Sequence, residues 1–235
     1  MLRWTLCFTT MLACASAQAA VHDAAADFTP ATTTNPNGVW SYGYDAAGDG
    51  GNYALVDFDV FDNSPSTPNW LKNGYNSFGT PTFYKRQTGP LNPANGLVLG
   101  QVGLHPGPAA TLFANDDAAI LRFTAPGNGL YAVNSQFFAS GGGETTAWVV
   151  LNGSFGSPLA ALGSTGSSPS YIVPSLALNV GDTLDFVVGN AGLYFFDTTG
   201  VNVSISVVPE PAVWMLWAGG LAALGTFARR RGRQG

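Results

Sequence analysis

The sequence predicts an all-β protein whose main part is an antiparallel β-sandwich or jelly roll of about eight to ten strands. Three observations favour this fold class. Gly, Asn, Ser, Thr, Asp and Pro, which are typical of turns, interrupt the chain roughly every eight to twelve residues. Short runs rich in β-branched and aromatic residues fill the intervals. Few stretches show the period of about 3.6 residues that marks a helix.

Several of the expected strands alternate apolar and polar residues, as a half-buried strand does. In residues 201–207, Val and Ile alternate with Asn and Ser, so the two kinds of side chain point to opposite faces. Asn152-Gly153 directly follows an apolar run and predicts a tight turn. The expected strands cover residues 39–44, 53–61, 82–86, 97–102, 118–124, 130–140, 145–151, 171–178, 183–189 and 201–208.

The first 19 residues have the composition of a secretory signal peptide. Arg3 precedes an apolar stretch of about 12 residues, and an Ala-x-Ala pattern follows it. Cleavage is expected after Ala19, with Ala17 and Ala20 as alternatives. An uncleaved membrane anchor at residues 4–15 is a further alternative, although this stretch is short for a membrane span. Residues 20–37 are expected to form a flexible mature N-terminus, and residues 38–207 the sandwich.

The C-terminus, residues 208–235, combines three features in a fixed order. Pro209-Glu210-Pro211 forms a stiff, extended stem, because proline lacks a backbone donor and restricts the residue before it. Residues 212–228 follow without a charge, at the short end of the length that spans a bilayer as a helix. The tail at 229–235 acts as a cytoplasmic stop signal through its arginines, Arg229, Arg230, Arg231 and Arg233.

This order of Pro-Glu-Pro, apolar helix and basic tail resembles the PEP-CTERM sorting signal of bacterial exosortase substrates. The resemblance implies that Pro209, Glu210 and Pro211 are recognised by an exosortase. It further implies a Gram-negative bacterium that makes extracellular polysaccharide. By this resemblance the chain is exported by the Sec machinery and held transiently in the inner membrane by its helix. It would then reach the cell surface or the extracellular matrix. A tail-anchored protein without processing is the alternative.

The exported part is acidic and lacks cysteine. Residues 21–208 carry four basic side chains against thirteen acidic ones, a formal net charge of −9. Such a surface cannot release phosphate counterions, so nucleic-acid binding and adhesion to anionic lipid are excluded as expected functions. Both cysteines, Cys7 and Cys14, lie in the signal peptide, so no disulfide is expected in the mature chain. Lipidation of Cys14 is an alternative to its removal with the signal peptide.

The second half of the chain also resembles a known architecture. Phe-x-Ala-Pro at 123–126, Gly-x-Tyr at 129–131, Val-x-Leu-Asn-Gly at 149–153 and Gly-Asp-Thr-Leu-Asp-Phe at 181–186 follow one another. This succession is similar to the jelly-roll domains of exported bacterial proteins. Carbohydrate-binding modules and C1q/TNF-like sandwiches share that architecture. The resemblance implies a fold for about residues 118–207 and no particular ligand.

Few residues offer catalytic or metal-binding chemistry. His22 lies near the expected mature N-terminus, and His105 lies in a Pro/Gly-containing segment. Asp57 and Asp59 have the spacing of a glycosidase carboxylate pair on one strand face, but a solvated outer face explains them as well. The Asp- and Gly-rich segment at 44–51 lacks the spacing of an EF-hand loop. We therefore expect no catalytic residue, no metal and no cofactor.

Aromatic side chains are the candidate ligand contacts. Trp40 and Tyr42 alternate on one face of the first expected strand, while Trp70 and Tyr75 lie in a Pro/Asn/Gly-rich segment. Exposed rings on a β-face could stack on sugar rings, whereas rings turned inward would belong to the core. The resemblance of the C-terminus to a PEP-CTERM signal, with no catalytic residue expected, implies a non-enzymatic surface or matrix protein associated with exopolysaccharide and biofilm. The alternative is a carbohydrate-binding module or a carbohydrate-active enzyme on the same scaffold.

Overall fold

The computed structural model describes residues 19–28, 34–45, 53–56, 69–71, 81–86, 96–107, 118–191 and 196–209, with only the backbone for 69–71. The chain divides into two units, and the described residues lie almost entirely in the unit Val21–Val208. Within the described residues, no helix has the length and apolar character needed to cross a membrane. The expected helix at 212–228 and all but the last residue of the expected signal peptide lie outside the described residues.

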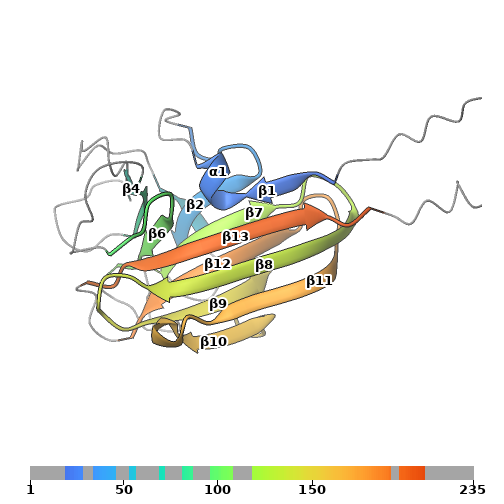
Figure 1. Cartoon of the computed structure of the whole chain (residues 1–235). Coiled ribbons are helices and arrows are strands. Elements are labelled where there is room, and N and C mark those ends of the chain that lie inside the picture. Colours follow the sequence, from blue (N-terminus) through green and yellow to red (C-terminus); the bar gives the residue numbers. More distant parts are fainter. Residues whose placement is uncertain are drawn as a thin grey trace, which may run out of the picture. The chain divides into compact units, whose positions relative to one another are not determined.

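The unit Val21–Val208 is a sandwich of two antiparallel sheets (Figure 1). Among the described residues, the first sheet has seven strands. In spatial order, that sheet contains β11 (Ser170–Leu178), β8 (Gly129–Ala139), β13 (Thr199–Val207), β6 (Val102–His105), β5 (Thr82–Lys85) and β4 (Asn69–Leu71), with β1 (Val21–Asp23) beside β13. The second contains β10 (Ala160–Ser164), β9 (Thr145–Leu151), β12 (Thr183–Asn190), β7 (Ala118–Thr124), β2 (Trp40–Asp45) and β3 (Tyr53–Leu55).

The prediction of an all-β antiparallel sandwich is therefore confirmed. β7 and β9 have the predicted bounds, and β8, β11, β12 and β13 differ from them by one or two residues. The Asn-Gly turn also occurs: Asn152 and Gly153 have φ angles of 50° and 67°, as a two-residue turn of this type needs. It opens the connection to β10, a strand that the sequence did not indicate.

One strand lies further along the chain than expected. The run at 97–102 predicts a strand, whereas β6 begins at Val102. Leu97 is instead fully buried and packs on the outer face of the first sheet, over Gly103. A Cβ atom at Gly103 would lie 2.7 Å from the Leu97 side chain, so the glycine is what admits Leu97 there. Of the apolar run, Leu97 is therefore buried outside the strands, whereas Val98 and Leu99 are exposed at 60% and 65%.

The mature N-terminus is ordered over residues 21–28, where the sequence predicted a flexible segment. β1 pairs with β13 through Val21 and Ser206, and α1 (Ala24–Asp27) follows it directly. Asp23 caps this short helix, because its Oδ1 accepts hydrogen bonds from the amides of Ala25 and Ala26 at 2.9 and 2.8 Å. Phe28 then enters the core at 1% exposure. The pairing of β1 with β13 and the burial of Phe28 hold residues 21–28 against the sandwich.

The core lies between the sheets and follows the alternation of the strands. From β13 it receives Val201, Val203 and Ile205, while the intervening residues face outward. Aromatic rings join the two sheets near β2. The Tyr42 ring meets Phe83 at 5.6 Å and Phe28 at 5.2 Å, both edge to face. Such contacts add to the hydrophobic stabilisation of the burial itself.

The outer face of the second sheet buries a further cluster, which contains an ion pair. Arg122 on β7 and Asp185 on β12 are direct cross-strand partners. The Arg122 guanidinium donates two hydrogen bonds to the Asp185 carboxylate. One runs from Nε to Oδ1 at 2.6 Å, and the other from Nη2 to Oδ2 at 2.8 Å. Its Cζ lies 3.6 Å from the centre of the Tyr53 ring, whose hydroxyl bonds to Ser41 at 2.8 Å. The apolar residues of this cluster are Ala118, Ile120, Val150, Phe155 and Val187.

We predict that removing one partner of this pair destabilises the sandwich more than replacing both. The Asp185 side chain has no exposure, so Asp185→Ala leaves the largely buried Arg122 charge without its partner. The expected loss is about 3–5 kcal/mol in the free energy of unfolding, measured by urea denaturation. The double replacement Arg122→Met with Asp185→Leu is expected to lose less than Asp185→Ala. Losses that simply add in a double-mutant cycle would contradict the prediction.

Candidate functional site

The structure places two of the four predicted aromatic contacts in the core. Trp40 is 1% exposed and Tyr42 is fully buried, so neither ring is available for stacking on a sugar. The Trp40 Nε1 donates to Asp27 Oδ2 at 2.9 Å, which satisfies its polar atom inside the fold. The backbone of Trp70 lies in β4, but its side chain is outside the described part, as is all of Tyr75.

His105 and Asp182 make local hydrogen bonds within the described fold. His105 ends β6, where its Nδ1 lies 2.8 Å from the Pro106 carbonyl oxygen, and burial lowers the pKa of its ring. Asp182 accepts hydrogen bonds from the Asn179 amide at 2.7 Å and from Asn152 Nδ2 at 3.0 Å, which lower its pKa. His22 lies in β1 rather than in a flexible segment. Asp57 and Asp59 lie outside the described residues.

The described Lys and Arg side chains also make hydrogen bonds or ion pairs within the fold. Lys85 donates to the Ala25 carbonyl of α1, and Arg86 donates to the Leu97 carbonyl at 2.9 Å. Arg122 is paired with Asp185. Within the described ranges, no group of three or more His, Cys, Asp and Glu side chains could hold a metal ion. The exposed polar chemistry of this part therefore comes mainly from amides and hydroxyls.

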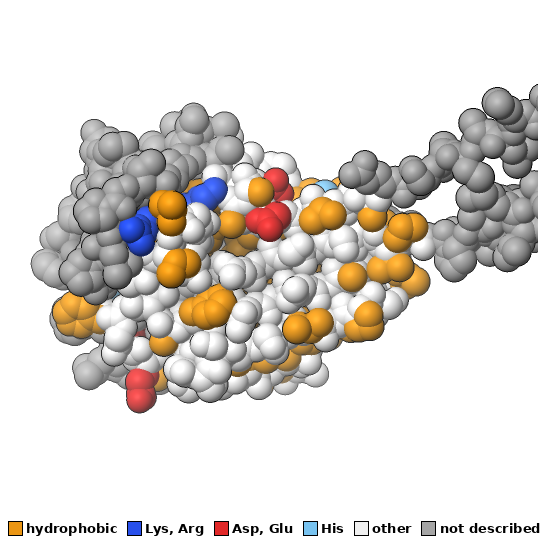
Figure 2. Space-filling model, in the orientation of Figure 1, with side chains coloured by type: hydrophobic (Ala, Val, Ile, Leu, Met, Phe, Trp, Pro, Cys, Tyr) orange, Lys and Arg blue, Asp and Glu red, His pale blue; other side chains and the backbone are white. Residues whose placement is uncertain are grey.

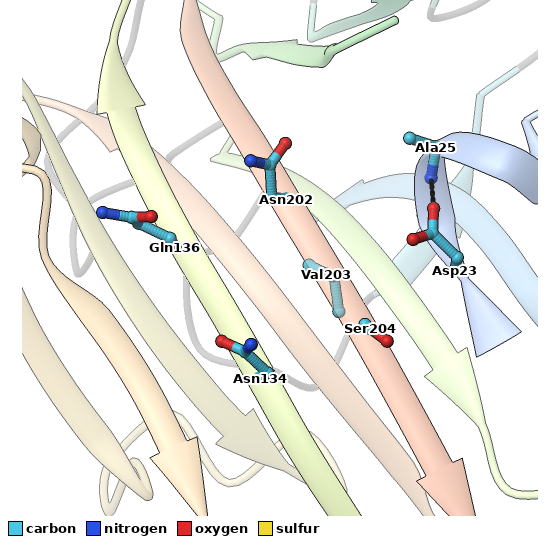
Figure 3. Close-up of a pocket in the computed structure, with 7 residues that line it drawn as sticks. All are labelled: Asp23, Ala25, Asn134, Gln136, Asn202, Val203 and Ser204. Atoms are coloured by element: carbon cyan, nitrogen blue, oxygen red, sulfur yellow. Dashed lines mark hydrogen bonds between the residues drawn. The ribbon is translucent and has the colours of Figure 1, made fainter. Parts of the chain in front are cut away.

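Polar side chains gather in a groove on the outer face of the first sheet (Figure 3). We name it the amide groove. It has a volume of about 190 Å³. β8, β13 and the start of α1 contribute its lining, which consists of Asp23, Ala25, Asn134, Gln136, Asn202, Val203 and Ser204.

The strand register positions these side chains. Gln136 on β8 is the direct partner of Asn202 on β13, and Asn134 is the direct partner of Ser204. Ser204 is also the partner of Asp23 on the other side. Side chains of direct antiparallel partners on one face have Cβ atoms about 4.5–5.5 Å apart. The groove is therefore a compact array of hydrogen-bonding groups from three neighbouring strands.

Most polar groups of the amide groove are open to a ligand. Asn134 and Asn202 are exposed, and their side chains make no hydrogen bond within the described residues. Gln136 makes one long contact, from Nε2 to the Ser168 carbonyl at 3.5 Å. Figure 2 shows that the face over β8 and β13 carries few charged side chains. No basic residue lines the groove.

A second hollow lies between α1 and the start of β2. It has a volume of about 390 Å³ and is lined by His22, Ala26, Asp27, Asn37, Gly38, Val39 and Trp40. Its polar groups are mainly engaged in holding the N-terminal segment. Asn37 Nδ2 donates to the Asp27 carbonyl at 2.9 Å, and Trp40 donates to the Asp27 carboxylate. This hollow thus offers fewer free groups than the amide groove.

Asp197 is a carboxyl group that the sequence did not single out. It is fully buried beside β13, and neither of its oxygens has a hydrogen-bond partner in the described part of the chain. Burial raises its pKa to about 7. The neighbouring Thr199 instead joins a buried chain of hydroxyls through Thr145 to Thr165, with oxygen distances of 2.5 Å.

The comparisons with known proteins assign no family. No family model matches the sequence, and no curated protein matches it. Among solved structures, the β-(1,4)-mannanase of Podospora anserina with GH26 and CBM35 parts is 18% identical, with a TM-score of 0.31. The match covers 57% of this chain and 29% of that chain.

Two further solved structures are distantly similar. A family 35 carbohydrate-binding module from Clostridium thermocellum is 13% identical, with a TM-score of 0.26, and the match covers 58% of this chain and 86% of the module. The isomalto-dextranase of Arthrobacter globiformis T6, in complex with panose, is 11% identical with a TM-score of 0.24. Here 72% of this chain and 23% of the enzyme are covered. Similarity this distant identifies neither a family nor a ligand.

We predict that Asp197 makes the sandwich less stable as the pH rises. In the unfolded chain this carboxyl ionises near its ordinary pKa of 3.8, whereas in the folded chain it ionises near pH 7. Between these two pKa values, Asp197 is protonated in the folded chain and ionised in the unfolded chain. The stabilising contribution of protonated Asp197 is therefore complete below about pH 4 and is lost by pH 7 to 8. Asp197→Asn should remove this decline.

The measurement is the difference in unfolding free energy between Asp197→Asn and the unchanged protein, from pH 4.5 to pH 8. Taking the difference cancels the contributions of other titratable groups, such as His105. The lowered pKa of His105 makes the unfolding free energy rise with pH just below its ordinary value of 6.5, which is opposite to the effect of Asp197. We expect the variant to gain relative stability with increasing pH. A flat difference curve would contradict the assignment of the raised pKa.

Proposed function

We propose that this chain is an exported, non-enzymatic protein of a Gram-negative cell envelope or extracellular matrix. The sandwich would be its exported domain. Its C-terminal segment would hold it transiently in the inner membrane, until an exosortase recognises Pro209, Glu210 and Pro211 and processes the tail. Extracellular polysaccharide is the proposed environment of the mature domain, as a component of a biofilm. The Sec machinery would translocate it, and the signal peptide at 1–19 would be removed.

The observation that carries this proposal is the position of the last backbone bond of the sandwich. The Val208 amide donates to the Leu130 carbonyl at 2.8 Å, and the next residue, Pro209, is exposed and has no amide hydrogen to pair. The folded unit thus stops one residue before Pro-Glu-Pro. A membrane enzyme could therefore reach Pro209 without opening β13.

The location of the chain ends supports the same proposal. Val21 pairs with Ser206, so the chain enters and leaves the sandwich at the same end (Figure 1). Signal-peptide cleavage and C-terminal processing would therefore both act at this end. The loops at the opposite end, such as the one from β8 to β9 at residues 140–144, would remain unaffected.

Three of the described carboxylates have structural roles. Asp185 is held by Arg122, Asp182 holds a turn, and Asp23 caps α1. Asp197 differs from them, because it is buried without a hydrogen-bond partner in the described part of the chain. The alternative of a carbohydrate-active enzyme stays a prediction for Asp57 and Asp59, which lie outside the described residues.

The test is mass spectrometry of the protein's C-terminus in its native host, in membrane and extracellular fractions. We expect the extracellular form of the unchanged protein to lack Arg229–Arg233. Combined replacement of Pro209, Glu210 and Pro211 by alanine should keep the whole tail attached and the chain in the membrane, because the recognition residues are gone.

Pro174→Ala serves as the matched control, since Pro174 is an exposed proline in the middle of β11, outside the tail. This variant should be processed like the unchanged protein. An intact tail on all three proteins would overturn exosortase processing and leave a simple tail anchor. Equal processing of the triple alanine variant would also overturn the assigned recognition residues.

A further inference from the structure

We propose that the amide groove binds a sugar unit of a neutral, hydroxyl-rich polysaccharide. This inference deepens the proposed function and rests on it in one respect, namely that an exported chain meets such polymers. It differs from the binding surface that the sequence predicted, because Trp40 and Tyr42 are buried on the inner face of β2. The recognition groups are instead uncharged polar side chains of β8 and β13.

The hydrogen-bonding capacity of the groove matches that of sugar hydroxyls. A carboxamide both donates from its NH₂ and accepts at its oxygen, and a hydroxyl group likewise does both. Asn134, Gln136 and Asn202 supply three carboxamides, and Ser204 supplies a hydroxyl. Neighbouring hydroxyls of one sugar ring could therefore each pair with a donor and an acceptor across β8 and β13. No group in this array requires a charged ligand.

Charge further restricts the ligand. The groove contains the Asp23 carboxylate and no Lys or Arg. Oδ1 of Asp23 accepts the amide hydrogens of Ala25 and Ala26, so the carboxylate is held at the edge of the groove. An acidic sugar or a phosphate would meet this like charge, and none of the lining residues carries a compensating positive charge. Neutral sugars avoid this repulsion and can donate a hydroxyl hydrogen to the free side of the carboxylate.

Two of the three amides of the groove make no hydrogen bond that would stabilise the fold. Asn is among the residues depleted in strands, yet Asn134 and Asn202 occupy the outward face of two non-edge strands. Their side chains gain no internal hydrogen bond within the described residues to offset this preference. Polar residues that have a low propensity for the strand they occupy, and that gain no hydrogen bond in return, are typical of functional surfaces. A ligand supplies the missing hydrogen bonds.

The size of the groove indicates weak binding of each sugar unit. Its volume of about 190 Å³ is smaller than the roughly 300–1,000 Å³ of pockets that enclose drug-sized ligands. No aromatic ring lines it, so the stacking that strengthens sugar binding is missing at this site. A polymer offers many identical units, and copies of this chain displayed together on one surface could bind it at several points. Linked contacts of this kind would compensate for the weak single contact.

The test is affinity gel electrophoresis of the full chain, purified in a mild detergent. Gels contain dextran, hydroxyethyl cellulose or galactomannan as neutral probes, alginate as an anionic probe, or gelatin as a protein probe. The unchanged chain should be retarded by at least one neutral polymer and not by alginate. The double variant Asn134→Ala with Asn202→Ala should bind that polymer about tenfold more weakly, because it loses two hydrogen-bonding groups.

A matched pair separates the groove from general surface effects. Asn202→Ala removes a hydrogen-bonding side chain within the groove, whereas Ser206→Ala removes one on the same strand and face outside it. Only Asn202→Ala should weaken retardation. Circular dichroism and the melting temperature verify that each variant is folded.

Absence of retardation by every neutral polymer would overturn the inference, as would undiminished binding of the double variant. Retardation by gelatin or alginate that the double variant abolishes would assign the groove to another ligand and overturn it as well. C-terminal processing is not measured here, so failure of this test leaves the proposed sorting intact. Conversely, an unprocessed tail would not affect the electrophoresis.

Discussion

The register between β13 and β8 is the constraint on which most of this structure depends. The two strands pair from Thr199 opposite Ala139 to Val207 opposite Tyr131. Because side chains alternate, a slip by one residue would move Val203 and Ile205 to the outer face and bring Asn202 and Ser204 into the core. The buried unpaired amide would then oppose folding. The same register that fills the core therefore also creates the polar surface of the outer face.

The sequence predicted the strands of seven or more residues well and several of the shorter ones poorly, for physical reasons. β7 and β9 are each runs of seven mainly apolar residues, so their pattern alone identifies them. β10, Ala160–Ser164, is short and rich in Ala, Gly and Ser, and it forms because the adjacent β9 offers an edge. α1 has only four residues and depends on the Asp23 cap and on Phe28 in the core. Contacts distant in sequence decide such elements.

The candidate site could be predicted only in part. Alternation placed Trp40 and Tyr42 on one face of a strand, but it cannot tell which face meets the core, and the structure turns these rings inward. The amides of the groove are far apart in the chain, and each resembles an ordinary solvated residue. The one available signal was Asn at outward positions of strands that are not at a sheet edge. Combining Asn134 with Asn202 required the pairing of β8 with β13.

β13 also has a mechanical consequence for a tethered protein. Its last residues lead directly to the stem at Pro209, and its middle carries Asn202 and Ser204 of the amide groove. A polymer that pulled on the groove while the stem was held would load β13 along its own axis. Its hydrogen bonds to β8 would then share the force in shear instead of breaking one after another. Such an arrangement would let a small sandwich resist flow while its single contacts remain weak.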